Sequence, residues 1–192
     1  MATATLRPNE DIAIGWGVGA TYTAIAEVVN QPSAGDGTII ACSKNDGGKE
    51  DIFGFGTVSG IDVCTQVVVW TYALRGSTEP PINHTFAIKL GSSWQATTSL
   101  NFGTSYAWKS YTFSDLSASQ SDIDGLQIKF TPGTMTSSDE TMSIDTVYAV
   151  ITYSEIVSSI LKVSGVAQAS VSKVSSTALA SIKAISGVSN VS

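Results

Sequence analysis

The side chains that most often carry out catalysis or bind metals are scarce in this sequence. It contains one histidine, His84, and two cysteines, Cys42 and Cys64. A catalytic triad needs a nucleophile in a recognisable setting, and no G-x-S-x-G pattern occurs. A zinc site needs three or four ligands at suitable spacing, which these residues do not show. We therefore expect no catalytic residue, metal site or cofactor, and two buried free thiols in preference to a disulfide.

Two acidic residues, Asp122 and Asp124, precede Gly125 in the stretch QSDIDGLQI, a pattern that resembles the start of a calcium-binding loop. A complete calcium loop needs more oxygen ligands and a distal glutamate. Because GLQIKF follows at once, we expect these acids to cap a turn that leads into a strand. No sequence motif identifies two of the acidic residues as the catalytic carboxylate pair of a glycoside hydrolase.

Several aromatic side chains could form a platform on which a sugar ring stacks. They are Trp16, Trp70, Trp94, Trp108, Tyr106 and Tyr111. Aromatic residues are also common core fillers, and Trp70 lies in the middle of a strand-like segment, so we expect it in the core. Trp94 and Trp108 lie near turns and are the candidate contacts with a glycan.

The last 33 residues are three copies of an 11-residue unit: ILKVSGVAQAS, VSKVSSTALAS and IKAISGVSNVS. Small apolar residues recur in them at spacings of three, four and four, which is an 11-residue helical period and predicts a right-handed bundle of several chains. The residues expected to mediate oligomerisation or attachment are Ile160, Val163, Ala167, Val171, Val174, Ala178, Ile182 and Ile185.

Gly165, Gly187 and the many serine and β-branched residues of these units are weak helix formers. The alternative is therefore extended segments with turns at Ser164-Gly165 and Ser186-Gly187. One copy has too little apolar surface to offset its ordering entropy in either form. Both interpretations predict a partner, most simply the same segment of a sister chain.

Short β-type segments bounded by Gly, Ser, Asn or Asp recur from residue 12 to residue 156. The longest are VCTQVVVWTYALRG and TMSIDTVYAVITY, and YTAIAEVV is either a strand or a helical turn. About eight to ten evenly spaced strands indicate an all-β fold, an antiparallel β-sandwich of the jelly-roll type. We expect an N-terminal arm (1–11), a sandwich domain (12–156) and the C-terminal repeats (157–192).

The charge is unevenly distributed along the chain. All sixteen acidic residues lie at or before Glu155, whereas the repeats carry three lysines, so the body has a net charge of −9 and the repeats +3. An acidic body is unsuited to binding nucleic acid. Neither a signal peptide nor a membrane-spanning run is apparent, so we expect no membrane partner.

Three segments resemble a β-sandwich module of tailed-bacteriophage virion proteins. They are the opening LRPNEDIAIGWGVG…TYTAIAEVV, the central VVVWTYALRG, and the later WKSYTFSDLSASQSDIDGLQIKF…MSIDTVYAVITY. The K-V-S-G-V units are similar to short repeats that end many phage structural proteins. The resemblance implies a non-enzymatic virion protein, made in the bacterial host cytoplasm, that serves as a capsid decoration protein or a tail fibre component.

The resemblance also implies a homo-oligomer, with a trimer favoured, which attaches to other capsid or tail proteins through its repeats. The first alternative is a carbohydrate-binding module or adhesin that recognises a cell-surface glycan. A second alternative is a self-polymerising filament subunit in which the repeats add a strand to a neighbouring sheet.

Overall fold

The computed structural model describes the chain except for residues 18–20, 29–32, 77–83, 96–97, 134–140, 157–161, 164–165, 168–183, 186–187 and 190–192. The chain forms two compact units, Met1–Glu155 and Ile156–Ser192. We call the first unit the body and the second the tail. No helix in the described part of the chain is long and apolar enough to cross a membrane.

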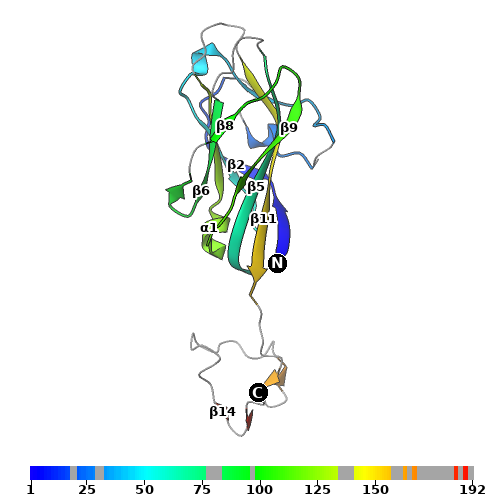
Figure 1. The fold of residues 1–192 in the computed structure, drawn as a ribbon, viewed down its shortest axis with the longest axis vertical. Helices are drawn as coiled ribbons and strands as arrows, with labels where there is room; N and C mark the ends of the chain where they lie inside the picture. Colours follow the sequence, from blue (N-terminus) through cyan, green and yellow to red (C-terminus); the bar gives the residue numbers. More distant parts are fainter. Residues whose placement is uncertain are drawn as a thin grey trace. The chain divides into compact units, whose positions relative to one another are not determined.

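The body is an antiparallel β-sandwich with two layers, in agreement with the fold class predicted from the sequence (Figure 1). Sheet A has the order β1-β11-β5-β9, and β3 also pairs with β11; it comprises β1 (Ala2–Leu6), β3 (Ile40–Cys42), β5 (Ile61–Arg75), β9 (Ala107–Phe113) and β11 (Met142–Glu155). Sheet B has the order β2-β4-β10-β6-β7, and β8 also pairs with β6; it comprises β2 (Pro8–Ala13), β4 (Asp51–Phe55), β6 (His84–Leu90), β7 (Ser93–Trp94), β8 (Thr98–Leu100) and β10 (Gln127–Thr131).

Among the described residues, the segments between the strands include the 3-10 turns η1 (Tyr22–Ala24) and η2 (Lys44–Asp46) and the helix α1 (Gln120–Asp124). The segment that could have been a strand or a helical turn is therefore a turn. Ser119 and Asp122 form a capping box at the start of α1, so Asp122 caps a turn before β10 as expected.

The N-terminal residues are part of the sheets, which corrects the prediction of an arm at 1–11. Strand β1 pairs with β11 from Ala2↔Tyr153 to Leu6↔Ala149, and β2 then pairs with β4. Leu6 is 4% exposed, so the chain's first strand contributes to the core. The N-terminus accordingly lies beside the end of β11 (Figure 1).

Alternating side chains of the two sheets fill the space between them. The largest fully buried side chains include Phe53, Phe86 and Phe130 from sheet B and Ile144 from sheet A. Phe86 and Phe130 lie with their ring centroids 6.4 Å apart. Burial of these rings supplies the apolar surface that holds a two-layer sandwich together.

The long strand β11 changes face at a bulge. Its register with β5 shifts between Ile144 and Thr146, so that Met142 and Ile144 point into the core before the bulge and Val147 and Ala149 point into it afterwards. An uninterrupted strand would have kept Ile144 and Tyr148 on one face, as the alternation in the sequence predicts. The bulge therefore turns Tyr148 toward the outer surface of sheet A.

The two cysteines are buried free thiols, as expected. Cys42 pairs with Met142 and Cys64 with Tyr153, at opposite ends of β11. At about 3.3 Å per residue this places them about 35 Å apart. A disulfide between them is therefore excluded by the fold.

The tail contains two short antiparallel pairs of strands. β12 (Lys162–Val163) pairs with β13 (Val166–Ala167), and β14 (Ala184–Ile185) pairs with β15 (Val188–Ser189). The two pairs occupy equivalent positions in the first and third repeats, on either side of a Ser-Gly dipeptide. For these residues the extended interpretation holds and the helical one is wrong.

Candidate functional site

Aromatic side chains from three strands gather on the outer surface of sheet A. Alternation along β5 points Trp70 and Tyr72 outward, because Val69, Thr71 and Ala73 point into the core. The register then places Tyr148 opposite Trp70 and Trp108 opposite Tyr72. We call the set formed by Arg7, Trp70, Tyr72, Tyr106, Trp108 and Tyr148 the aromatic face.

The rings of the aromatic face are in continuous contact across the sheet. Trp70 stacks on Tyr148 with centroids 6.2 Å apart, and Trp108 meets Tyr148 edge to face at 5.5 Å. Tyr72 lies 5.1 Å from Trp108 and 5.3 Å from Tyr106. At the β1 edge the Arg7 guanidinium lies 5.3 Å from the Tyr148 ring centroid, a cation–π contact.

The aromatic face is fixed in place and partly open to solvent. The Trp108 indole N–H donates a 2.9 Å hydrogen bond to the carbonyl of Ser33, which holds the ring against the loop between η1 and β3. Trp70, Tyr72, Tyr106 and Trp108 are half-buried, whereas Tyr148 is 5% exposed and forms the floor. A rigid, partly exposed set of rings is the type of surface that the C–H faces of a sugar can stack on.

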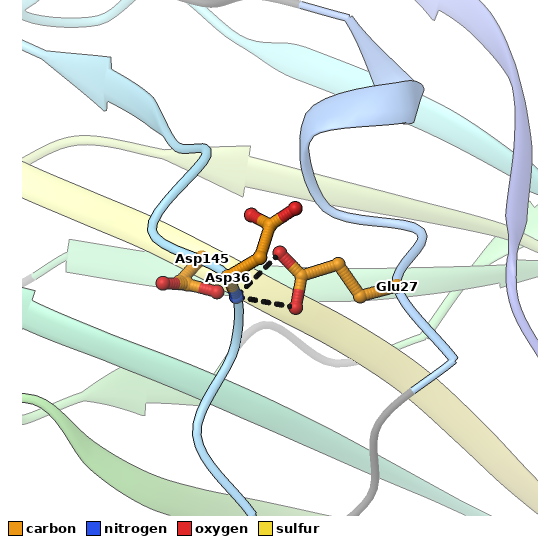
Figure 2. Close-up of side chains that lie close together, drawn as sticks. All are labelled: Glu27, Asp36 and Asp145. Atoms are coloured by element: carbon orange, nitrogen blue, oxygen red, sulfur yellow. Dashed lines mark hydrogen bonds between the residues drawn. The ribbon is translucent and has the colours of Figure 1, made fainter.

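Three carboxylates border this face where the loop between η1 and β3 meets the β11 bulge (Figure 2). Glu27 and Asp36 come from the loop and Asp145 from the bulge, and one ligand oxygen of each lies within 4.8 Å of the others. We call these residues the acidic cluster. The Asp36 backbone N–H donates to both Glu27 oxygens, at 3.1 and 3.0 Å.

Asp145 anchors the cluster. It is 3% exposed, and its two oxygens accept hydrogen bonds from the Gly37 N–H at 3.2 Å and from the Thr146 hydroxyl at 3.1 Å. A Cβ atom at Gly35 would lie 1.4 Å from one of these oxygens, so only glycine allows the loop to approach so closely. With both oxygens occupied and almost no exposure, Asp145 is poorly placed for glycoside hydrolysis.

Burial, and secondarily the nearby carboxylates, perturb the pKa values of two groups at this site. Burial raises the pKa of Glu27 to about 7, aided by its hydrogen bond with the Asp36 side chain and by the Asp145 charge. The pKa of Tyr106 is also raised, first by burial and then by Asp145. The Asp145 charge therefore acts on Tyr106, a member of the aromatic face.

The donor set of the acidic cluster suits a hard divalent cation. Calcium takes six to eight oxygen ligands from carboxylates, backbone carbonyls and water, and Glu27, Asp36 and Asp145 would supply the carboxylate share. The calcium-loop-like pattern at Asp122-Ile123-Asp124 is not where the described carboxylates converge, because Asp122 accepts a 2.7 Å hydrogen bond from the Ser119 hydroxyl.

The raised pKa of Glu27 predicts a pH-dependent stability. A carboxyl group whose folded pKa lies above its ordinary value of 4.5 stabilises the fold below that pH, and the stabilisation is lost as the pH rises to about 7. Because Glu27 is partly exposed, solvent screening limits the effect to the order of 1 kcal/mol. Denaturant unfolding of the full chain at about pH 5 and pH 8 measures it, and Glu27→Gln is expected to flatten the difference.

The matched control is Glu155→Gln, which removes an exposed carboxylate at the end of β11 and should leave the pH dependence unchanged. A Glu27→Gln variant with the same loss of stability between the two pH values as the unmodified chain would contradict the assignment.

The structure separates the two candidate glycan contacts. Trp108 belongs to the aromatic face of sheet A, whereas Trp94 lies on β7 at the edge of sheet B. Trp70 was predicted as a core residue but faces outward. The alternation of a strand defines two faces and does not reveal which of them the second sheet covers. Trp16 is 4% exposed and donates its backbone N–H to Asp51 at 2.9 Å, so it is a core residue.

The remaining chemically interesting residues are structural or only partly described. His84 is 1% exposed, and its Nδ1 accepts a 3.3 Å hydrogen bond from the Gly133 N–H. Of the positions predicted for oligomerisation, Val163, Ala167 and Ile185 lie in strands of the tail. The others lie outside the described residues: Ile160, Val171, Val174, Ala178 and Ile182.

Comparisons with known proteins identify no family. No protein-family model matches the sequence, and no curated protein matches it. Among solved structures, CBM35 from Cellvibrio japonicus Abf62 is similar at 12% identity and a TM-score of 0.44, over 80% of this chain and 95% of that one. A family 35 carbohydrate binding module from an environmental isolate has 16% identity and a TM-score of 0.40, over 78% and 97%.

The CBM36-1 domain of a multidomain xylanase from the hindgut metagenome of Trinervitermes trinervoides shares 12% identity at a TM-score of 0.38, over 81% of this chain and all of that domain. Identity this low leaves the function to be argued from this chain's own side chains.

Proposed function

We propose that the body is a non-catalytic glycan-binding module and that the aromatic face is its binding surface. The observation that carries the proposal is the continuous set of rings from Arg7 to Tyr106, held rigidly on the outside of a sheet and partly exposed. Exposed apolar patches rimmed by polar residues mark interaction sites, and ligand sites are lined mainly by hydrophobic and aromatic side chains.

The border of the face indicates the kind of sugar. Glu27 and Asp36 of the acidic cluster offer carboxylate oxygens that accept hydrogen bonds from hydroxyl groups, and the three carboxylates together disfavour an anionic sugar at this border. An uncharged sugar satisfies both conditions, with its C–H face on Trp70 or Trp108 and its hydroxyls toward the carboxylates. The ligand class is therefore a neutral polysaccharide or a neutral surface glycan.

The tail would present several bodies together. Paired strands of two residues are too short to be stable alone, so we assign them the role of joining tails of sister chains, three in the favoured arrangement. The resemblance to virion proteins would make such an assembly a decoration or fibre component of a phage particle. The glycan-binding proposal does not depend on that setting.

A glycan array followed by calorimetry tests the aromatic face. The full chain is expected to bind neutral oligosaccharides, and Trp108→Ala or Trp70→Ala should weaken binding about ten-fold or more, because the loss of one stacking ring costs about 1–2 kcal/mol. Thermal unfolding of each variant checks that the fold is retained.

Trp94→Ala is the matched control, since it removes a tryptophan from the other sheet and should leave neutral-glycan binding unchanged. The proposal fails if no neutral glycan binds, or if folded Trp70 and Trp108 variants bind as well as the unmodified chain.

A further inference from the structure

The outer surface of sheet B carries a straight row of polar and aromatic side chains. Gln127 on β10 pairs with Lys89 on β6, and Lys89 pairs with Trp94 on β7. All three point outward, because their neighbours Ile128 and Leu90 point into the core. Adjacent strands are about 4.8 Å apart, so the row runs about 10 Å across the sheet, a length that suits one or two sugar units.

Trp94 is held by a cation–π contact and is partly exposed. The Lys129 ammonium lies 4.7 Å from the indole centroid and forms a 2.9 Å ion pair with Glu50. Ala87, the outward residue of β6 opposite Lys129, is 1% exposed, so the outer surface of sheet B is covered at that position. Trp94 nevertheless remains 37% exposed, which leaves an anchored ring open to solvent.

The charges beside Trp94 are unbalanced. Lys129 is neutralised by Glu50, whereas Lys89 forms no ion pair with any described residue. Two further acids lie near the ends of this row: Glu10, whose side chain lies over Gly54 on the far side of Gln127, and Asp122, whose carboxylate lies against Gly91 in the turn between β6 and β7. Lys89, without an ion pair among the described residues, is therefore the register partner of the partly exposed Trp94 on one side and of Gln127 on the other.

We propose that the row of Gln127, Lys89 and Trp94, which we call the sheet B row, binds an acidic sugar of the uronic acid class. The C–H face of the sugar stacks on Trp94, its carboxylate pairs with Lys89, and its hydroxyls bond to Gln127. The aromatic face is bordered by carboxylates and suits neutral sugars, so the two outer surfaces of the sandwich select different ligands. The sheet B row needs no contribution from the aromatic face.

Calorimetry of the full chain with short oligogalacturonides at low ionic strength tests the assignment. Trp94→Ala and Lys89→Gln are each expected to weaken binding about ten-fold or more, and Lys89→Gln should also reduce the salt dependence. Lys109→Gln, which removes an exposed lysine from β9 of sheet A, is the control for general charge and should have no effect.

The site is overturned if oligogalacturonides do not bind, if folded Lys89 and Trp94 variants bind them normally, or if Lys109→Gln weakens binding as much as Lys89→Gln. Binding of a neutral cello-oligosaccharide, measured for the unmodified chain and for Trp108→Ala, tests the aromatic face separately from the sheet B row. Loss of neutral-glycan binding in Trp108→Ala with oligogalacturonide binding intact supports two independent surfaces.

Discussion

Deletion of residues 156–192 is expected to leave a folded, monomeric body that binds a glycan-coated surface about two to four orders of magnitude more weakly than the full chain. The body is a compact unit that ends with Glu155, and its core is complete by Tyr153. Its single-site affinity for a soluble glycan should therefore be unchanged. The truncation removes only the increase in affinity for a multivalent surface that comes from linking several bodies.

Three measurements on the full and truncated chains check this result: light scattering with size exclusion, calorimetry with a soluble glycan, and binding to an immobilised glycan. A truncated chain that still assembles would show that self-association resides in the body. Fibres in negative-stain images of the full chain, absent after truncation, would favour the filament alternative over a discrete oligomer.

A point variant within the tail tests whether the paired strands themselves are responsible for assembly. Val163→Asp introduces a charge into β12 without shortening the chain. Assembly should weaken if the paired strands of the first repeat join sister chains, because a buried charge is costly at an interface. Normal assembly by this variant would show that the contact between sister chains lies in another part of the tail.

Much of the sandwich could be predicted from the sequence because strand patterns are local. The strands β5 and β11 differ from the predicted segments VCTQVVVWTYALRG and TMSIDTVYAVITY by only one or two residues at each end. Turn residues mark strand ends through backbone preferences that need no knowledge of the fold. The segment WQATTSL is divided between β7 and β8.

The faces of the strands were harder to predict than their positions. The bulge at Asp145 shifts the alternation of β11, and a bulge leaves no reliable mark in a single sequence. Trp70 is outside the core because sheet B covers the other side of β5. Which of two apolar faces is covered depends on the second sheet, which local patterns do not describe.

The candidate site depends on contacts between residues far apart in the chain. Thr146 lies 119 residues from Glu27, yet its hydroxyl is 3.1 Å from the Glu27 carboxylate. Neither Glu27 nor Asp36 lies in a recognisable metal or catalytic motif. The sequence did contain one indication of the aromatic face. Trp70 and Tyr72 are two residues apart and therefore lie on the same face of β5.

Phe130→Ala is expected to lower the free energy of unfolding by about 3–5 kcal/mol, a large part of the stability of a domain of this size. Phe130 is 0% exposed and lies in β10, between β4 and β6 in sheet B. Its ring is 6.3 Å from Trp16 and 6.4 Å from Phe86, so its removal leaves a cavity against two rigid rings that cannot collapse into it.

Denaturant unfolding of the full chain, followed by tryptophan fluorescence, measures the loss. Thr131→Ala is the matched control, because the next residue of β10 points outward and should cost about 1 kcal/mol or less. A Phe130→Ala variant that loses less than about 1 kcal/mol would mean that sheet B does not pack on sheet A as described. If Phe130→Ala lowers stability and leaves both glycan affinities unchanged, the interior of the sandwich holds the fold and its two outer surfaces bind the ligands.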